Sequence, residues 1–301
     1  MLKPLSLNLK HAELLLLTIA AGLLALAVFG PTVTQPAHQH AFADARTWAN
    51  IPYAMDVLSN AAFALWGAVG LLACYGLRRR KPMLMYTRKH MHTHMHTHLH
   101  LRLQLVLAAL FFIGLLLTAV ASAFYHLQPI DSGLCVDRLG MVVAFAGLLG
   151  LAICGHVSAR AGLFAAVAVL LLGPASIWFW LESGNVLPWL VVQFGGMVVV
   201  VMVACIKPLG GALQVRWAMV VLVYAVAKVL ELADHKLYAI TNQVVSGHSL
   251  KHLVASLAAW PVLSAVRSVN LPAMASANAP AFASVQNAGR IQLTNFDTRA
   301  L

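Results

Sequence analysis

Eight mostly apolar stretches, each about as long as a membrane crossing requires, constrain this chain more than any other feature. A helix needs roughly 20 apolar residues to cross the hydrocarbon core. In hydrocarbon every backbone N–H and C=O group must be paired internally, so such spans are helices. The sequence therefore predicts an all-α integral membrane protein. The stretches lie at 13–29, 54–76, 103–125, 138–155, 162–180, 187–206, 216–233 and 248–265.

The composition excludes an ordinary water-soluble domain. Of the 301 residues, 61% are hydrophobic and 10% are charged, against about 45–50% apolar and about 25% charged in soluble domains. The net charge of +11 would indicate nucleic-acid binding in a soluble protein. Here the Lys and Arg residues gather between particular spans, so we expect no nucleic-acid partner.

The distribution of these basic residues predicts the orientation in the membrane, because cytoplasmic connections carry an excess of Lys and Arg. They precede the first span and follow the second, fourth, sixth and eighth, whereas the alternate connections carry little beyond Arg46, Arg138 and Lys236. Both termini are therefore expected in the cytoplasm. The connections expected outside are 30–53, 127–137, 181–187 and 234–247.

The chain divides into three parts. Residues 1–36 are expected to form an extra N-terminal transmembrane helix and its loop; a cleaved signal peptide is the alternative for this first span. Residues 37–267 are expected to form a seven-transmembrane-helix bundle, with a His-rich cytoplasmic insertion at 78–102. Residues 268–301 are rich in Ala, Ser and Asn, which predicts a disordered tail.

Three histidines are expected at the same face of the membrane. Ser122 and His126 end the third span four residues apart, so they share a helix face. His248 and His252 open the eighth span with the spacing that lets two imidazoles face one metal. Three neutral imidazoles that leave a fourth position open are a donor set of catalytic zinc. The sequence therefore predicts a zinc centre near the extracytoplasmic face.

Other polar residues within or beside the spans have structural alternatives. Lys228 and Glu231 lie on adjacent turns, which favours an intramembrane ion pair; alternatively, Glu231 or Asp234 orients a ligating histidine. A cluster near the outer end of the second span predicts either interhelical hydrogen bonds or a second cation site. Its members are Asp56, Ser59 and Asn60.

A tract of six alternating histidines lies between 90 and 100. Such tracts bind metal weakly. This one is expected on the cytoplasmic side, opposite the three-histidine cluster, so we interpret it as a tolerated insertion, with metal buffering or regulation as the alternative.

The order of the motifs resembles the alkaline ceramidase and phytoceramidase family, within the CREST superfamily of seven-helix membrane hydrolases. The resemblance covers about residues 40–265. It rests on Phe42-Ala43-Asp44-x-Arg46, Ile51-Pro52 with Ser59-Asn60, Ser122-x-x-x-His126, Asp137-Arg138-Leu139 and Ser246-Gly247-His248-x-x-Lys251-His252. The closest similarity is to bacterial members, which implies a bacterial inner membrane.

The resemblance implies zinc held by His126, His248 and His252, with Ser122 and Asp137 beside the metal. It implies hydrolysis of the N-acyl amide bond of a ceramide-like membrane lipid to a fatty acid and a sphingoid-type amine. Eukaryotic ceramidases also carry an acidic calcium-binding segment before the first core helix. The ligands of that segment do not align here, so calcium binding stays open.

In this hypothesis Asp137 acts as general base and then general acid, and Ser122 holds the attacking water or donates to the oxyanion. A non-enzymatic metal-binding receptor or transporter is the alternative. A transporter would place ionisable residues along the bilayer midplane, whereas these histidines gather at one face. Haem held between two histidines is a third possibility, but the nearby Ser and Asp fit a metal-bound water better than a haem. The sequence identifies neither the exact lipid nor the oligomeric state.

Overall fold

The computed structural model describes residues 9–79 and 91–269, and most of these residues are helical. Within them there is no β-strand, only two isolated bridges, Thr34 with Asn185 and Trp48 with Ile51. The helices are α1 Leu9–Phe29, α2 Ala54–Ser59, α3 Ala61–Arg79, α4 Met91–Leu127, α5 Asp131–His156, α6 Ala159–Ser183, α7 Leu187–Leu190, the π-helical turn η2 Val191–Gly195, α8 Gly196–Ala204, α9 Trp217–Leu232, α10 Asp234–Ile240, α11 Gly247–Ser256 and α12 Ala259–Arg267.

The predicted all-α membrane bundle is confirmed. Seven helical segments of the described chain are long and apolar enough to cross a membrane: His11–Phe29, Ala54–Arg79, Leu99–Leu127, Asp131–His156, Ala159–Ser183, Leu187–Ala204 and Gly247–Arg267. Helix α9, with 16 residues, is shorter, but it packs against α8 and α11. The architecture is a seven-helix bundle with α1 added at the N-terminus.

Two helices begin earlier than the apolar stretches predicted. Helix α5 begins at Asp131, because an acidic residue in a first turn interacts favourably with the helix dipole; Asp137 therefore lies in its second turn. Helix α4 begins at Met91, since neither Gly nor Pro interrupts residues 91–102, so part of the predicted insertion is continuous with the span. Residues 80–90, the side chains at 91–98 and the predicted tail beyond 269 lie outside the described residues.

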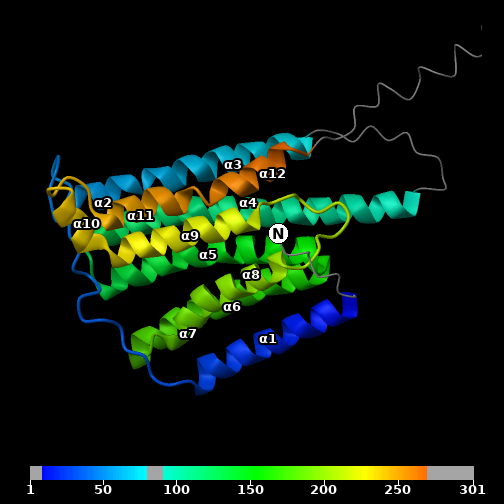
Figure 1. The fold of residues 1–301 in the computed structure, drawn as a ribbon, viewed down its shortest axis with the longest axis horizontal. Helices are drawn as coiled ribbons and strands as arrows, with labels where there is room; N and C mark the ends of the chain where they lie inside the picture. Colours follow the sequence, from blue (N-terminus) through cyan, green and yellow to red (C-terminus); the bar gives the residue numbers. More distant parts are fainter. Residues whose placement is uncertain (1–8, 80–90, 270–301) are drawn as a thin grey trace, which may run out of the picture.

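Helices α4 and α5 form the centre of the bundle, with α3 and α12 on one side and α6, α8 and α1 on the other (Figure 1). Small residues let α4 and α5 approach closely: a Cβ at Gly114 would lie 2.1 Å from the backbone of Ala144, and one at Gly147 would lie 2.2 Å from that of Phe111. Helix α1 lies at the edge beside α7 and η2. Only 6% of the residues in its apolar stretch are buried.

One end of the bundle collects the polar connections. The loop at 30–53, α2, α10 and the start of α11 lie there together, on the left of Figure 1. We call this end of the bundle the loop end. The last turn of α4 and the first turns of α5 and α11 reach it, so it brings together residues more than 100 positions apart in the sequence.

Candidate metal centre

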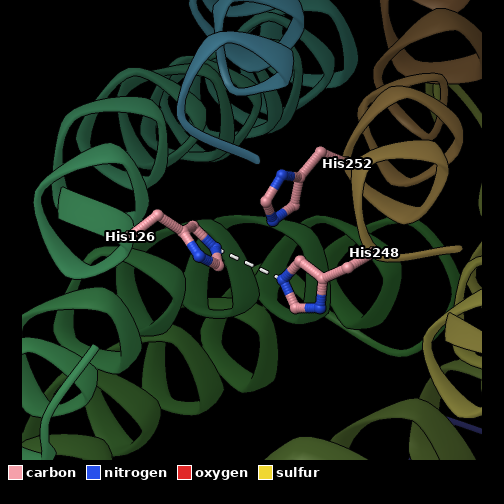
Figure 2. Close-up of side chains that lie close together, drawn as sticks. All are labelled: His126, His248 and His252. Carbon is pink, nitrogen blue, oxygen red and sulfur yellow. Dashed lines mark hydrogen bonds between the residues drawn. The ribbon is translucent and has the colours of Figure 1, made fainter. Parts of the chain in front are cut away.

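Three histidines from two helices meet at the loop end. His126 comes from the last turn of α4, and His248 and His252 come from the first two turns of α11. Their side chains turn toward one another (Figure 2), and one ring nitrogen from each lies within 4.8 Å of the others. The three residues are buried, with 1%, 6% and 3% exposure respectively. The structure thus brings the three predicted ligands into one cluster.

The geometry of the cluster fits a metal ion. The Nε2 atoms of His126 and His248 lie 3.2 Å apart. Two nitrogen ligands at 2.0–2.1 Å from a tetrahedral zinc ion lie about 3.3 Å from each other. The triad could hold such an ion through three imidazoles, and a tetrahedral ion would then have one position left for water or substrate.

Ser59, at the end of α2, orients His252. The Ser59 hydroxyl lies 2.8 Å from Nδ1 of His252 and donates a hydrogen bond to the backbone carbonyl of Asp56 at 3.0 Å. Because this hydroxyl proton is already used, Nδ1–H of His252 is the donor to Ser59, and Nε2 keeps its lone pair. Hydrogen bonds of this kind fix the tautomer of metal-binding histidines. The sequence predicted for Ser59 either interhelical hydrogen bonds or a second cation site, and not a contact with His252.

Two buried carboxylates hold the first turn of α11. Asp56 accepts hydrogen bonds from the hydroxyls of Ser249 at 2.6 Å and Ser246 at 3.3 Å, and Ser246 itself caps the helix by accepting from the Ser249 N–H. Asp234 accepts from the backbone N–H of His248 at 2.8 Å. Asp234 therefore positions the backbone of His248 and not its ring, which differs from the alternative considered from the sequence.

The loop at 30–53 covers the three histidines. The second oxygen of Asp234 accepts from the backbone N–H of Ala43 at 3.0 Å. This contact places the neighbouring Phe42 ring 4.6 Å from the ring of His126 and 4.5 Å from that of His248, measured between centroids. An aromatic ring on the triad excludes water from the loop side of the cluster.

An ion pair between the buried Asp44 and the half-exposed Arg46 fastens this loop. The Arg46 guanidinium donates to both carboxylate oxygens of Asp44, at 2.8 and 2.6 Å, and also to the carbonyl of Val244. Burial by itself would raise the pKa of Asp44, but the hydrogen bonds and charge of Arg46 outweigh it and hold that pKa below its usual value. Asp44 therefore stays ionised and keeps the loop attached to the segment before α11.

A chain of charges runs beside the triad. Glu231 accepts from Lys228 at 2.5 Å and from Lys251 at 3.1 Å, so the ion pair predicted for Lys228 and Glu231 is present. The ammonium of Lys251 also lies 3.1 Å from Nε2 of His248. A metal ion held by the triad would face this ammonium, and Glu231 supplies compensating negative charge.

A cavity extends from the cluster into the bundle. Its volume is about 190 Å³, part of it is open to the outside, and Ser122, Asp137 and His252 all line it. Ser122 lies one turn before His126 on α4, and its side chain interacts with the Asp137 carboxylate of α5. Deeper in the cavity most of the lining is apolar: Phe111, Leu115, Ala144, Phe145, Leu148, Met197 and Val220, with Thr118, Gln193 and Tyr224 as polar exceptions.

Comparison of the chain with known protein families, with curated proteins and with solved structures finds no match. The resemblance to the ceramidase family therefore rests on the sequence motifs alone. Of the motif residues, the structure brings His126, His248 and His252 into one cluster and places Ser122 and Asp137 on the wall of the adjoining cavity.

Several residues around the cluster had no role predicted from the sequence. Phe42 and Lys251 belong to the quoted motifs. The contact of Phe42 with the histidines depends on how the loop folds back, whereas Lys251 lies one turn after His248 on α11 and contacts it through that spacing. For Phe42, position in a motif was the only available signal. Tyr125 and His40, joined by a 2.8 Å hydrogen bond beside the centre, carried no such signal at all.

Proposed function

We propose that this protein is a zinc-dependent membrane amidase that hydrolyses the N-acyl amide bond of a ceramide-like lipid. The observation that carries the proposal is the convergence of three buried histidines at the end of a mostly apolar cavity that Asp137 and Ser122 also line. A donor set of three imidazoles, a carboxyl group and an apolar chain-binding space are the parts that such a hydrolysis requires.

Each residue has a part in the reaction. A zinc ion bound by the triad would supply a Lewis acid that polarises the amide carbonyl and activates water. Asp137 takes a proton from the attacking water as the C–O bond forms, and it delivers a proton to the amine nitrogen as the C–N bond breaks. The Ser122 hydroxyl interacts with the Asp137 carboxylate before the reaction. Once Asp137 has taken up the proton, the Ser122 hydroxyl is free to donate toward the developing oxyanion.

The cavity would receive the acyl chain. Phe111, Leu115, Thr118 and Ser122 line it from successive turns of α4. The 15 residue-to-residue steps from Phe111 to His126 correspond to roughly 22 Å of helix. This length suits a long acyl chain whose amide lies at the triad. The surrounding bilayer is the natural source of such a substrate, because the cavity is open on part of its surface.

The sidedness of the proposed site follows from the basic residues of the connections. Both termini would lie in the cytoplasm of a bacterial cell, and the loop end, with the triad, would lie at the outer face of the inner membrane. The loop at 30–53, which covers the triad through Phe42, would then face the extracytoplasmic space.

Metal content tests the proposal most directly. The full chain is purified with the histidines between 90 and 100 replaced by Gln, because this tract would otherwise bind metal itself. We expect about one zinc per chain by mass spectrometry, and none in the double variant His248→Ala, His252→Ala. The matched control is the double variant His11→Ala, His38→Ala, whose histidines are exposed and lie outside the triad.

Hydrolysis of ceramide and of simpler N-acyl lipids is measured on the same samples. Release of fatty acid by the zinc-loaded protein, lost in the triad variant and kept in the control, supports the amidase. A folded protein without zinc, or one that keeps zinc and activity without His248 and His252, would overturn the proposal and favour a receptor or transporter.

A further inference from the structure

Arg138, next to the proposed general base, is a buried cation with an unused donor. It is 7% exposed, and its guanidinium stacks on the rings of Trp180 at 4.2 Å and Trp189 at 5.5 Å. Its Nη2 donates to the side-chain carbonyl of Gln35 at 3.1 Å. Its Nη1 is buried, and no residue in the described part of the chain accepts a hydrogen bond from it.

The charge of Arg138 is also unpaired. Among the ion pairs formed by the described residues, none includes Arg138. A charged side chain within a membrane protein is costly unless it meets an opposite charge or water, and a guanidinium fixed between two indole rings cannot turn away easily. A group that binds the free donor and neutralises the charge would relieve this cost.

The same cavity contains an excess of positive charge. Three cations line it, Arg138, Lys228 and Lys251, against two carboxylates, Asp137 and Glu231. Glu231 is shared between both lysines, and the proposed reaction uses Asp137 for proton transfer. Electrostatic complementarity therefore favours an anionic ligand over a neutral one.

The position of Arg138 indicates which part of the ligand is anionic. Its partner Gln35 belongs to the loop at 30–53, whereas the apolar lining, such as Leu148 on the same helix, lies several turns away toward the other end of the bundle. An acyl chain bound along that apolar lining would place the amine part of the lipid beside Arg138.

We propose that Arg138 binds an anionic oxygen group, a carboxylate or a phosphate, on the amine part of the lipid substrate. The preferred substrates are then anionic N-acyl lipids. The identification of this ligand as a substrate rests on the proposed function, whereas the anion-binding site at Arg138 does not depend on it. The planar guanidinium suits such groups, since it donates two parallel hydrogen bonds to one carboxylate or phosphate.

The test compares ligands with one acyl chain and different head groups. Binding of N-palmitoylglycine, N-palmitoylethanolamine phosphate, neutral N-palmitoylethanolamine and palmitate is measured on the zinc-loaded full chain in nanodiscs of neutral lipid. We expect the two anionic amides to bind at least about tenfold more tightly than the neutral amide, the scale of one charge-assisted pair. Equal affinities in the wild-type protein overturn the inference, whether or not any variant folds.

Variants assign the preference to the guanidinium. Arg138→Gln should reduce the preference to about twofold or less and leave the neutral amide unaffected, whereas Arg138→Lys should retain part of it. The matched control is Arg216→Gln, because Arg216 also stacks on an indole, that of Trp260 at 5.2 Å, but does not line the cavity. A preference that survives Arg138→Gln overturns the inference.

Three further outcomes are decisive; the first concerns the inference alone, and the other two separate it from the proposed function. If palmitate alone shows the same Arg138-dependent affinity, the recognised anion is the carboxylate of a fatty acid, and the assignment to the amine part is overturned. Hydrolysis is followed in the same samples. Equal hydrolysis of neutral and anionic amides leaves the amidase intact and overturns the inference; Arg138-dependent binding without any hydrolysis supports the anion site and overturns the amidase.

Discussion

The two ends of the cavity are built differently. At the loop end, hydrogen bonds from distant parts of the chain fix the polar side chains; His252, for example, is held by Ser59, 193 positions away. At the other end, Phe111, Leu115 and Leu148 belong to a close-packed core that fixes shape without directional bonds. Ionisable groups at the boundary of the bilayer remain within reach of water, whereas the middle remains apolar. Changes at the loop end should therefore alter metal binding or chemistry, and changes at the other end should alter only chain selection.

The largest effect is expected at Asp137. Asp137→Asn removes the proton acceptor but keeps the size of the side chain, so hydrolysis should fall about 10²- to 10⁴-fold while the zinc content stays at one per chain. Steady-state hydrolysis and metal analysis measure the two effects. Glu182→Gln is the control, because Glu182 is exposed and does not line the cavity. Full activity in Asp137→Asn would exclude its role as general base.

The next effect is expected at Ser59. Ser59→Ala removes the hydrogen bond that fixes the tautomer of His252, so zinc affinity should fall about 10- to 100-fold, as measured by competition with a chelator. The control is Ser176→Ala, because the Ser176 hydroxyl bonds only to the carbonyl of Gly173 in its own helix. An unchanged affinity in Ser59→Ala would mean that packing alone orients His252.

The apolar end is tested at Leu115. Leu115→Trp should narrow the cavity and lower hydrolysis of long-chain amides about tenfold relative to short-chain amides, with unchanged zinc content. Overpacking also costs stability, typically about 1–3 kcal/mol, so unfolding is measured in parallel. The control is Leu117→Trp, since Leu117 lies on the same helix with 46% exposure and faces outward. Loss of zinc in Leu115→Trp would contradict the claim that changes at the apolar end leave metal binding unaltered.

The smallest effect concerns the loop that covers the triad. The folded pKa of Asp44 lies below its usual value, so the stabilisation from its pair with Arg46 is present above the unfolded pKa of about 3.9 and is lost as the pH falls through the folded pKa. Asp44→Asn should therefore be less stable than the wild type at pH 7, by on the order of 1–3 kcal/mol, and the difference should shrink in acid. Chemical unfolding at several pH values checks this; a difference that does not depend on pH would exclude the ion pair as its source.

The helical architecture followed from apolar length, because a backbone in hydrocarbon has few alternatives to the helix. Helix ends were less predictable: α5 begins at Asp131, where the interaction of an acidic residue with the helix dipole favours helix in spite of the polarity of the first turns. The histidine pair on α11 was predictable from its spacing of four. The partners of these histidines were not, since nothing in local spacing places Ser59 or Phe42 beside them.

The sequence by itself determined that the chain enters a membrane as a helical bundle, and that His126, His248 and His252 are suitable metal ligands. Only the tertiary structure decided that they meet, that Ser59 fixes one ring, and that Arg138 keeps a buried donor without a partner among the described residues. The physical reason is range. Apolar spans and helical spacing can be recognised within short stretches of the sequence. The site, in contrast, depends on contacts between helices that are distant in the sequence.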